Sequence, residues 1–104
     1  MNDTPLKKYK VLCEGMISPF QSFEYELGET LTCAEFDDDE NVSCSDGFYA
    51  TDIEGIVYSM QKNRQVYEVE VSGKRVEYDQ FKCRYEKQRI VRLVPKAEVR
   101  TLLE

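Results

Sequence analysis

Alternation of apolar and polar residues marks the first extended segment of the chain. In KYKVLC, residues 8–13, the alternation puts Tyr9, Val11 and Cys13 on one side and two lysines on the other. A period of two residues is that of a strand, because successive side chains of a strand point to opposite faces of the sheet. The segment is therefore predicted to be a half-buried strand.

Two longer stretches alternate in the same way, SFEYELGE at residues 22–29 and QVYEVEVSGKRVEY at residues 65–78. Gly28 interrupts the first, and Ser72-Gly73 within the second predicts a tight turn. Apolar side chains on one face and glutamates on the other predict strands with one buried face. The predicted inward residues are Phe23, Tyr25, Leu27, Tyr67, Val69 and Val71.

Three shorter segments also have the character of strands. TLTCAE, residues 30–35, precedes an acidic loop, and RIVRLV, residues 89–94, is largely apolar. Between them, Phe81, Cys83 and Tyr85 keep an apolar alternation on one face. The chain is therefore predicted to be mostly β-structure.

Helical periodicity replaces alternation only after Ala50. Apolar residues there recur at i, i+3, i+4 and i+7, which predicts a central helix lying on the sheet. Thr51 followed by Glu54 fits a capping box, in which both side chains satisfy amides at the helix start. After Pro95, KAEVRTLLE at residues 96–104 is predicted to form a short terminal helix. The stripe of the central helix consists of Ile53, Ile56, Val57 and Met60.

These elements predict an α+β fold, a mostly antiparallel twisted sheet with one central helix and a short C-terminal helix. The length of 104 residues suits a single domain over residues 1–104. No apolar run approaches the roughly 20 residues that span a bilayer, and the start MNDTPLKKYK lacks the apolar core of a signal peptide. We therefore expect a cytoplasmic protein that does not enter a membrane.

The chain has four cysteines and no histidine. The cysteines form no CxxC pair, so a zinc site is not expected, and the missing imidazole removes the usual general base near neutral pH. Cys13, Cys33 and Cys83 occupy alternating apolar positions and are predicted to be buried, reduced and inert. Cys44 lies outside that pattern and is the one candidate for a reactive thiol.

Charge is distributed unevenly along the chain. Residues 1–52 hold 3 Lys/Arg against 12 Asp/Glu, whereas residues 53–104 hold 11 against 8. The acidic run EFDDDE has three interpretations, a solvated loop, a calcium-binding loop or a mimic of a phosphate backbone. The overall acidity disfavours nucleic-acid binding, although a local basic strip occupies residues 82–100. The candidate residues for binding a protein partner are Glu35, Asp37, Asp38, Asp39 and Glu40.

Five pieces of the chain occur in the order YKVL, FEYELG, CSDGFYA, YEVEVSG and RIVRLV. In this order they resemble a family of small domains found in bacteriophages, prophages and gut bacteria. The third piece is similar to the family's Cys-x-x-Gly-Phe-His-x-Cys stretch, with Tyr49 in place of the His and Thr51 in place of the second Cys. The resemblance implies a phage or prophage protein, and chemistry that relies on that histidine is not expected here.

GFYATDIEGIVY, residues 47–58, and the VYEVEVSG strand after it also resemble ADP-ribosyltransferase-like domains. Those domains have a Gly-Ile-Tyr-Phe-Ala-Asp strand, a helix with a further Tyr, and an aliphatic strand ending in Gly. The resemblance implies an aromatic cleft for nicotinamide and a polar anchor on the first strand, but no motif singles out the glutamate that such an enzyme needs. The candidate ligand-binding residues are Tyr9, Lys10, Cys44, Gly47, Tyr49 and Tyr58.

The Gly-aromatic-aromatic stretch at Gly47 has two interpretations. It is either a structural corner that packs against the sheet or part of a ligand site at a helix start, where amides point outward. The predicted cap by Thr51 and Glu54 occupies those amides, which favours the structural corner.

We therefore expect a non-enzymatic binding domain with no catalytic residues, no metal and no cofactor. The expected partner is a host or virion protein rather than nucleic acid, and the chain is expected to be a monomer or a homodimer. The alternatives are an ADP-ribosyltransferase-like domain that binds NAD or a related nucleotide, and a minor virion component.

Overall fold

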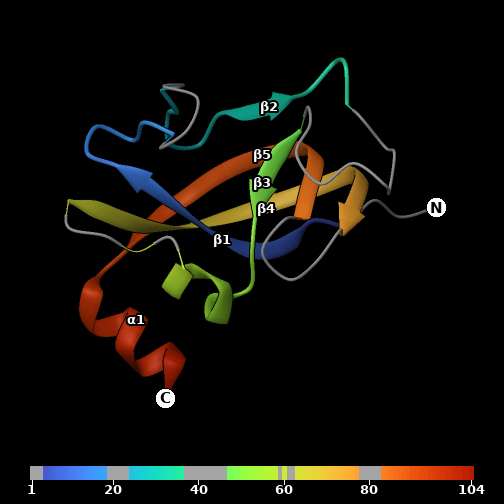
Figure 1. Ribbon diagram of the computed structural model, residues 1–104. Coiled ribbons are helices and arrows are strands. Elements are labelled where there is room, and N and C mark those ends of the chain that lie inside the picture. Colours follow the sequence, from blue (N-terminus) through green and yellow to red (C-terminus); the bar gives the residue numbers. More distant parts are fainter. Residues whose placement is uncertain (1–3, 19–23, 37–46, 59, 61–62, 78–82) are drawn as a thin grey trace.

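The computed structural model (Figure 1) describes residues 4–18, 24–36, 47–58, 60, 63–77 and 83–104. These described residues form five strands, one 3₁₀ helix and one α-helix. They are β1 (Leu6–Cys13), β2 (Thr30–Thr32), β3 (Phe48–Ala50), η1 (Ile53–Tyr58), β4 (Arg64–Glu77), β5 (Cys83–Val94) and α1 (Lys96–Leu103).

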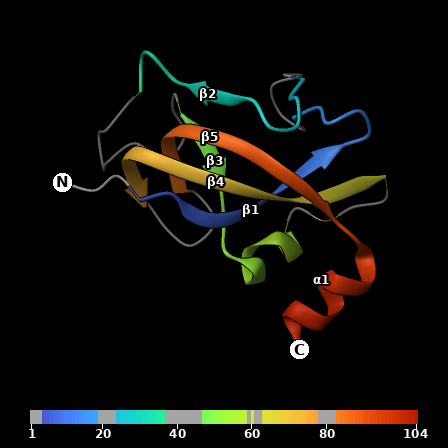
Figure 2. The same cartoon turned by 180° about the vertical axis from the view of Figure 1, so that it is seen from behind.

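All five strands belong to one antiparallel sheet with the order β1-β4-β5-β2, and β3 also pairs with β5. Just after β3, Thr51 and Tyr9 of β1 exchange two backbone hydrogen bonds with N···O distances of 2.7 and 2.9 Å. The paired segments β1, β4, β5 and β3 therefore form a ring, and the sheet curls around its inner face (Figures 1 and 2). The predicted antiparallel sheet is confirmed.

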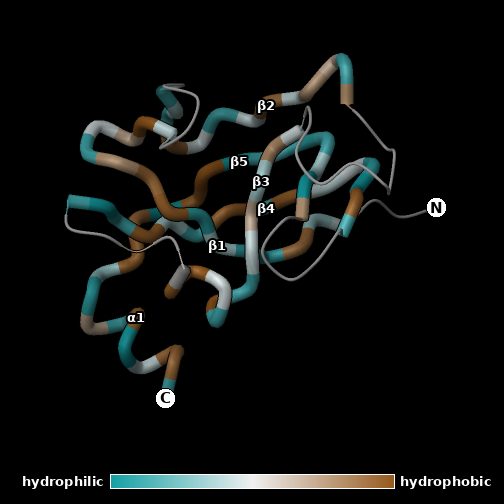
Figure 3. Tube along the Cα trace, in the orientation of Figure 1, coloured by the Kyte–Doolittle hydropathy of each residue, from teal (hydrophilic) through white to brown (hydrophobic). Residues whose placement is uncertain are grey.

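The long strands β4 and β5 supply the centre of the sheet. Val69 lies opposite Ile90, and Val71 lies opposite Gln88. β-Branched residues suit such positions because they pack well on a pleated surface. Figure 3 shows the apolar stretches of β1, β4 and β5 converging at the middle of the molecule. The inner cluster of buried residues is Leu12, Tyr25, Ala50, Tyr67, Val69, Val71, Cys83, Tyr85 and Ile90, which confirms the inward prediction for Tyr67, Val69 and Val71.

The opposite face of the sheet is partly covered by η1 and α1. Helix α1 begins after Pro95, as predicted, and Val99 packs with Ile56 of η1. The outer cluster of buried residues is Tyr9, Val11, Ile56, Val66, Val94 and Val99. Both faces of the central strands are therefore buried at this end of the sheet.

The prediction of a half-buried first strand is wrong, because β1 is buried on both of its faces. Tyr9 and Val11 lie in the outer cluster, whereas Leu12 lies in the inner cluster and Lys10 is also buried. Cys13 is only half-buried, as is Cys33, so burial is confirmed for Cys83 alone among the three cysteines predicted to be inert.

The predicted turn at Ser72-Gly73 is also wrong, because β4 continues through it to Glu77. The pairing with β5 shifts register between Ser72 and Arg75, which is a β-bulge. Gly73 has φ 78°, and a Cβ there would lie 2.4 Å from a carboxylate oxygen of Glu86. That oxygen also accepts a hydrogen bond from the Lys74 amide at 3.1 Å. The glycine thus permits a bulge that Glu86 closes.

The central α-helix is not confirmed, because the described residues there form the 3₁₀ helix η1. Ile56 is buried as the stripe predicts, but Val57 is 51% exposed. The predicted capping box does not form. It needs a hydrogen bond from the Thr51 amide to the Glu54 carboxylate, but this amide donates to the Tyr9 carbonyl instead. A Cβ on Gly55 would lie 1.9 Å from the Thr51 hydroxyl, so this glycine permits the close approach of Thr51.

Residues 24–29 do not form the predicted strand. Tyr25 is buried, but Leu27, predicted on the same face, is 57% exposed and makes only an isolated parallel bridge to Ile90. The short strand expected at residues 30–35 is present as β2. Phe23 and Phe81 lie outside the described residues.

Candidate functional site

The interior of the curled sheet contains a buried lysine. Lys10 of β1 is 8% exposed, and its Nζ donates to the Tyr49 carbonyl at 2.5 Å and to Gln88 Oε1 at 3.3 Å. The same nitrogen lies 5.1 Å from the centroid of the Tyr25 ring, which is a cation–π distance. Lys10 therefore links β1, β3 and β5 from the inside.

Burial lowers the pKa of Lys10 to about 7, because the charged amine loses its hydration. Burial also raises the pKa of Tyr85, so that its hydroxyl stays protonated. The Tyr85 hydroxyl is buried without a hydrogen-bond partner within the described ranges. The amine of Lys10 thus lies among buried polar groups enclosed by the sheet.

The structure brings some of the candidate ligand-binding residues together. Lys10 and Tyr49 meet through the Tyr49 carbonyl, whereas the Tyr9 side chain lies in the outer cluster. Gly47 has φ 151°, and a Cβ there would lie 3.0 Å from the Phe36 ring. Each of these described candidates is therefore in contact with the folded core.

Several other candidate residues have side chains that lie outside what the structure describes. Tyr58 ends η1, but its side chain lies outside what the structure describes. The acidic residues before β3 and the candidate thiol fall in residues 37–46, which are also outside. They are Asp37, Asp38, Asp39, Glu40 and Cys44.

The stretch after Gly47 contributes to the core. Phe48 packs edge to face against Tyr25, with ring centroids 6.4 Å apart and an interplanar angle of 62°. Ala50 belongs to the inner cluster. These contacts support the interpretation of this stretch as a structural corner.

Sequence reasoning missed Gln88 and Arg84 as interior residues. Gln88 is in phase with Ile90 along β5, so strand periodicity could have placed it inward. Arg84 was assigned to the basic strip, yet it is fully buried where β5 pairs with β3 and β4. No local signal distinguishes it from the other basic residues of the strip.

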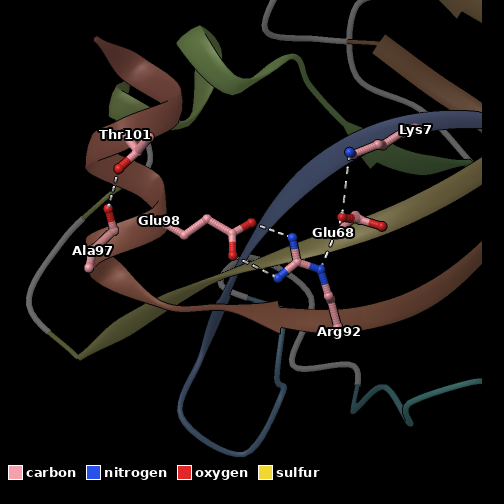
Figure 4. Close-up of polar contacts among 6 residues, drawn as sticks. All are labelled: Lys7, Glu68, Arg92, Ala97, Glu98 and Thr101. Carbon is pink, nitrogen blue, oxygen red and sulfur yellow. Dashed lines mark hydrogen bonds and ion pairs between the residues drawn. The ribbon is translucent and has the colours of Figure 1, made fainter.

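The outer face of β4 and β5 carries charges that pair with one another (Figure 4). Glu68 lies 3.8 Å from Lys7 Nζ and accepts a hydrogen bond from Arg92 Nε at 3.2 Å. Arg92 also binds Glu98 of α1 with two guanidinium nitrogens, one of them at 3.0 Å. A hydrogen bond from Arg92 lowers the pKa of Glu98. We call this surface the paired face, which consists of Lys7, Glu68, Glu70, Arg89, Arg92 and Glu98.

The paired face accounts for much of the basic strip at residues 82–100. Arg89 donates to Glu70 from Nε at 2.9 Å, Arg92 is held by two carboxylates, and Arg84 is buried. Three of the arginines in the strip are therefore used within the fold.

The segment around β2 differs from the paired face. Its glutamates are exposed, and none of them makes an ion pair with another described residue. Glu35 was among the predicted partner-binding residues. The alternation at residues 22–29 predicted Glu24 and Glu26 on the polar face of a strand. We call β2 with these carboxylates the acidic edge, and the carboxylates are Glu24, Glu26, Glu29 and Glu35.

No family model, curated protein or solved structure matches this chain. Over the described ranges, no group of three or more Cys, Asp or Glu side chains could hold a metal ion. No helix in these ranges is long and apolar enough to cross a membrane.

Proposed function

We propose that this chain is a small non-enzymatic binding domain that captures a protein with a basic surface through its acidic edge. The resemblance to phage and prophage domains supports a host or virion protein as that partner. Nucleic acid is not the expected partner, because the phosphates would meet exposed carboxylates at this edge.

The proposal rests on a difference in ion pairing between the paired face and the acidic edge. On the paired face, Arg89 and Arg92 are neutralised by Glu70, Glu68 and Glu98. At the acidic edge, the carboxylates are exposed and make no such pairs within the described part of the chain. Exposed charge of one sign, left unpaired by the fold, attracts a partner of opposite sign and speeds association.

Capture from bacterial lysate with charge-reversed variants tests the proposal. We expect the wild-type chain to enrich a basic protein and Glu26→Lys/Glu29→Lys to lose it, because both changes lie at the acidic edge. Glu54→Lys/Glu104→Lys is the matched control, since it makes the same charge change at two exposed positions elsewhere. Equal capture by both double variants would contradict the proposal.

The resemblance to ADP-ribosyltransferase-like domains gives a second candidate, the binding of NAD or a related nucleotide. One observation favours it, because Lys10, a candidate polar anchor on the first strand, donates a hydrogen bond to the backbone carbonyl of Tyr49. If it is right, NAD at ten times its Kd stabilises the fold by about 1.4 kcal/mol, and Tyr49→Ala abolishes the effect. An unchanged melting temperature at millimolar NAD would remove its support.

A further inference from the structure

We propose that the outer edge of β2 accepts an extended basic segment of the partner as an added antiparallel or parallel strand. This inference rests on the proposed function and specifies how the acidic edge would bind. The occupant is a peptide segment with basic side chains, bound by main-chain hydrogen bonds as well as by charge.

The register of β2 shows which of its backbone groups point outward. The Cys33 amide donates to the Glu86 carbonyl of β5 at 2.8 Å. Inward-pointing amides recur every second residue in an antiparallel pair, so the Leu31 amide also faces β5. The amides and carbonyls of Thr30 and Thr32 then face away from β5, where no described residue pairs with them.

The side chains of β2 suit such an edge. Leu31 is half-buried and packs against the inner cluster, whereas Thr30 and Thr32 are exposed. The leucine therefore anchors the strand while the two threonines remain accessible. In Figure 1, β2 lies at the outer side of the sheet, beyond β5.

Charge decides between a basic segment and a second copy of this chain. Glu29 immediately precedes β2, and Glu35 follows it by three residues. Two copies joined edge to edge would bring these carboxylates together, and like charges across strands are destabilising. A segment rich in Lys or Arg would instead neutralise them.

The other outer strand, β1, is less available for strand addition. Tyr9 already exchanges backbone hydrogen bonds with Thr51, and Cys13 does so with Ile17. Along β1, Lys7 pairs with Glu68 and Lys8 pairs with Asp52, so these carboxylates are already used within the fold. The geometry and the charge both favour β2.

Fluorescence anisotropy with a labelled peptide of about eight alternating Lys and Thr residues tests this inference. The control peptide replaces each Thr by Pro, which keeps the charge but removes half of the amide donors and disfavours a strand. We expect the Lys-Thr peptide to bind at least about tenfold more tightly than the Lys-Pro peptide.

Two variants of Thr32 separate main-chain recognition from charge. Thr32→Pro removes an outward amide without removing a hydrogen bond to β5, and it should weaken Lys-Thr binding about tenfold or more. Thr32→Val keeps the amide and the strand propensity, so its affinity should stay within about twofold of wild type. Circular dichroism and urea unfolding of both variants establish that each remains folded.

The outcomes distinguish this inference from the function on which it rests. Loss of binding in Thr32→Pro but not in Thr32→Val supports strand addition. Equal binding by both Thr32 variants, together with loss in Glu26→Lys/Glu29→Lys, would overturn strand addition and leave charge-based capture standing. An absence of binding at about 1 mM peptide would overturn strand addition, and the capture experiment then decides the proposed function alone.

Discussion

The paired face and the acidic edge use the same residue types for different purposes. On the paired face, Glu68 is 15% exposed in its side chain and contacts both Lys7 and Arg92. At the acidic edge, Glu26 and Glu29 are exposed and unpaired among the described residues. Among the described residues, the fold thus pairs the charges of one surface and leaves exposed carboxylates without such partners on the other.

The largest expected difference between the two surfaces is in stability. Glu68→Lys places a cation between Lys7 and Arg92 and should lower the free energy of unfolding by about 2 kcal/mol. Glu26→Lys should change it by less than about 0.5 kcal/mol, because the side chain is exposed. Urea unfolding of both variants at the same ionic strength makes the comparison, and similar losses would contradict it.

Lys10 extends the comparison of paired and exposed charges to the interior, because the fold buries its amine. Its pKa falls from 10.5 in the unfolded chain to about 7 in the folded protein. Between these values the unfolded chain binds more protons, so the free energy of unfolding rises with pH. Below pH 7 the amine is charged in both states, so the cost of burying it is largest and no longer varies with pH.

Lys10→Met should remove that part of the pH dependence. From pH 7 to pH 9, the wild-type free energy of unfolding should rise by about 2 kcal/mol relative to the variant. Measurements stop below pH 10, because burial raises the pKa values of Tyr25, Tyr67 and Tyr85 and adds an opposite trend above it. Parallel curves for wild type and variant would contradict the assignment of Lys10.

The smallest expected effect concerns the contact between α1 and the paired face. Glu98→Gln removes the carboxylate that Arg92 binds, so the backbone amides of α1 should exchange with solvent somewhat faster. The effect should be greatest at low salt, because exposed ion pairs are screened. Glu104→Gln is the control at the end of the same helix, and equal exchange in the two variants would show that the Arg92 contact does not hold α1.

The confirmed predictions concern long, regular segments. Tyr67, Val69 and Val71 alternate with glutamates along β4, and such a pattern fixes which face is buried. Pro95 likewise fixes the start of α1, because proline is disfavoured inside a helix. Local rules were sufficient in both cases.

The errors arose where distant residues decide the local structure. Ser72-Gly73 is equally compatible with a turn and a bulge, and the Glu86 carboxylate favours the bulge. Lys10 looked like a solvent-facing residue, but Tyr49 and Gln88 meet it when the sheet curls. These contacts span 39 and 78 residues of sequence, so no window of neighbouring residues reveals them.

The candidate site was predictable only in part. The exposure of Glu35 agrees with its predicted place on a charged surface. The pairing of Arg89 and Arg92 was not visible, because their partners lie on other elements. The outer edge of β2, which pairs with no other described strand, could be identified only from the sheet order.

The most direct test of the account is a ¹⁵N chemical-shift titration of the wild-type chain with the Lys-Thr peptide. We expect the largest shift changes at residues 24–36, with Thr30 and Thr32 among them, while the signals of Glu68, Arg92 and α1 stay unchanged. Shifts centred on the paired face, with residues 24–36 unaffected, would contradict it.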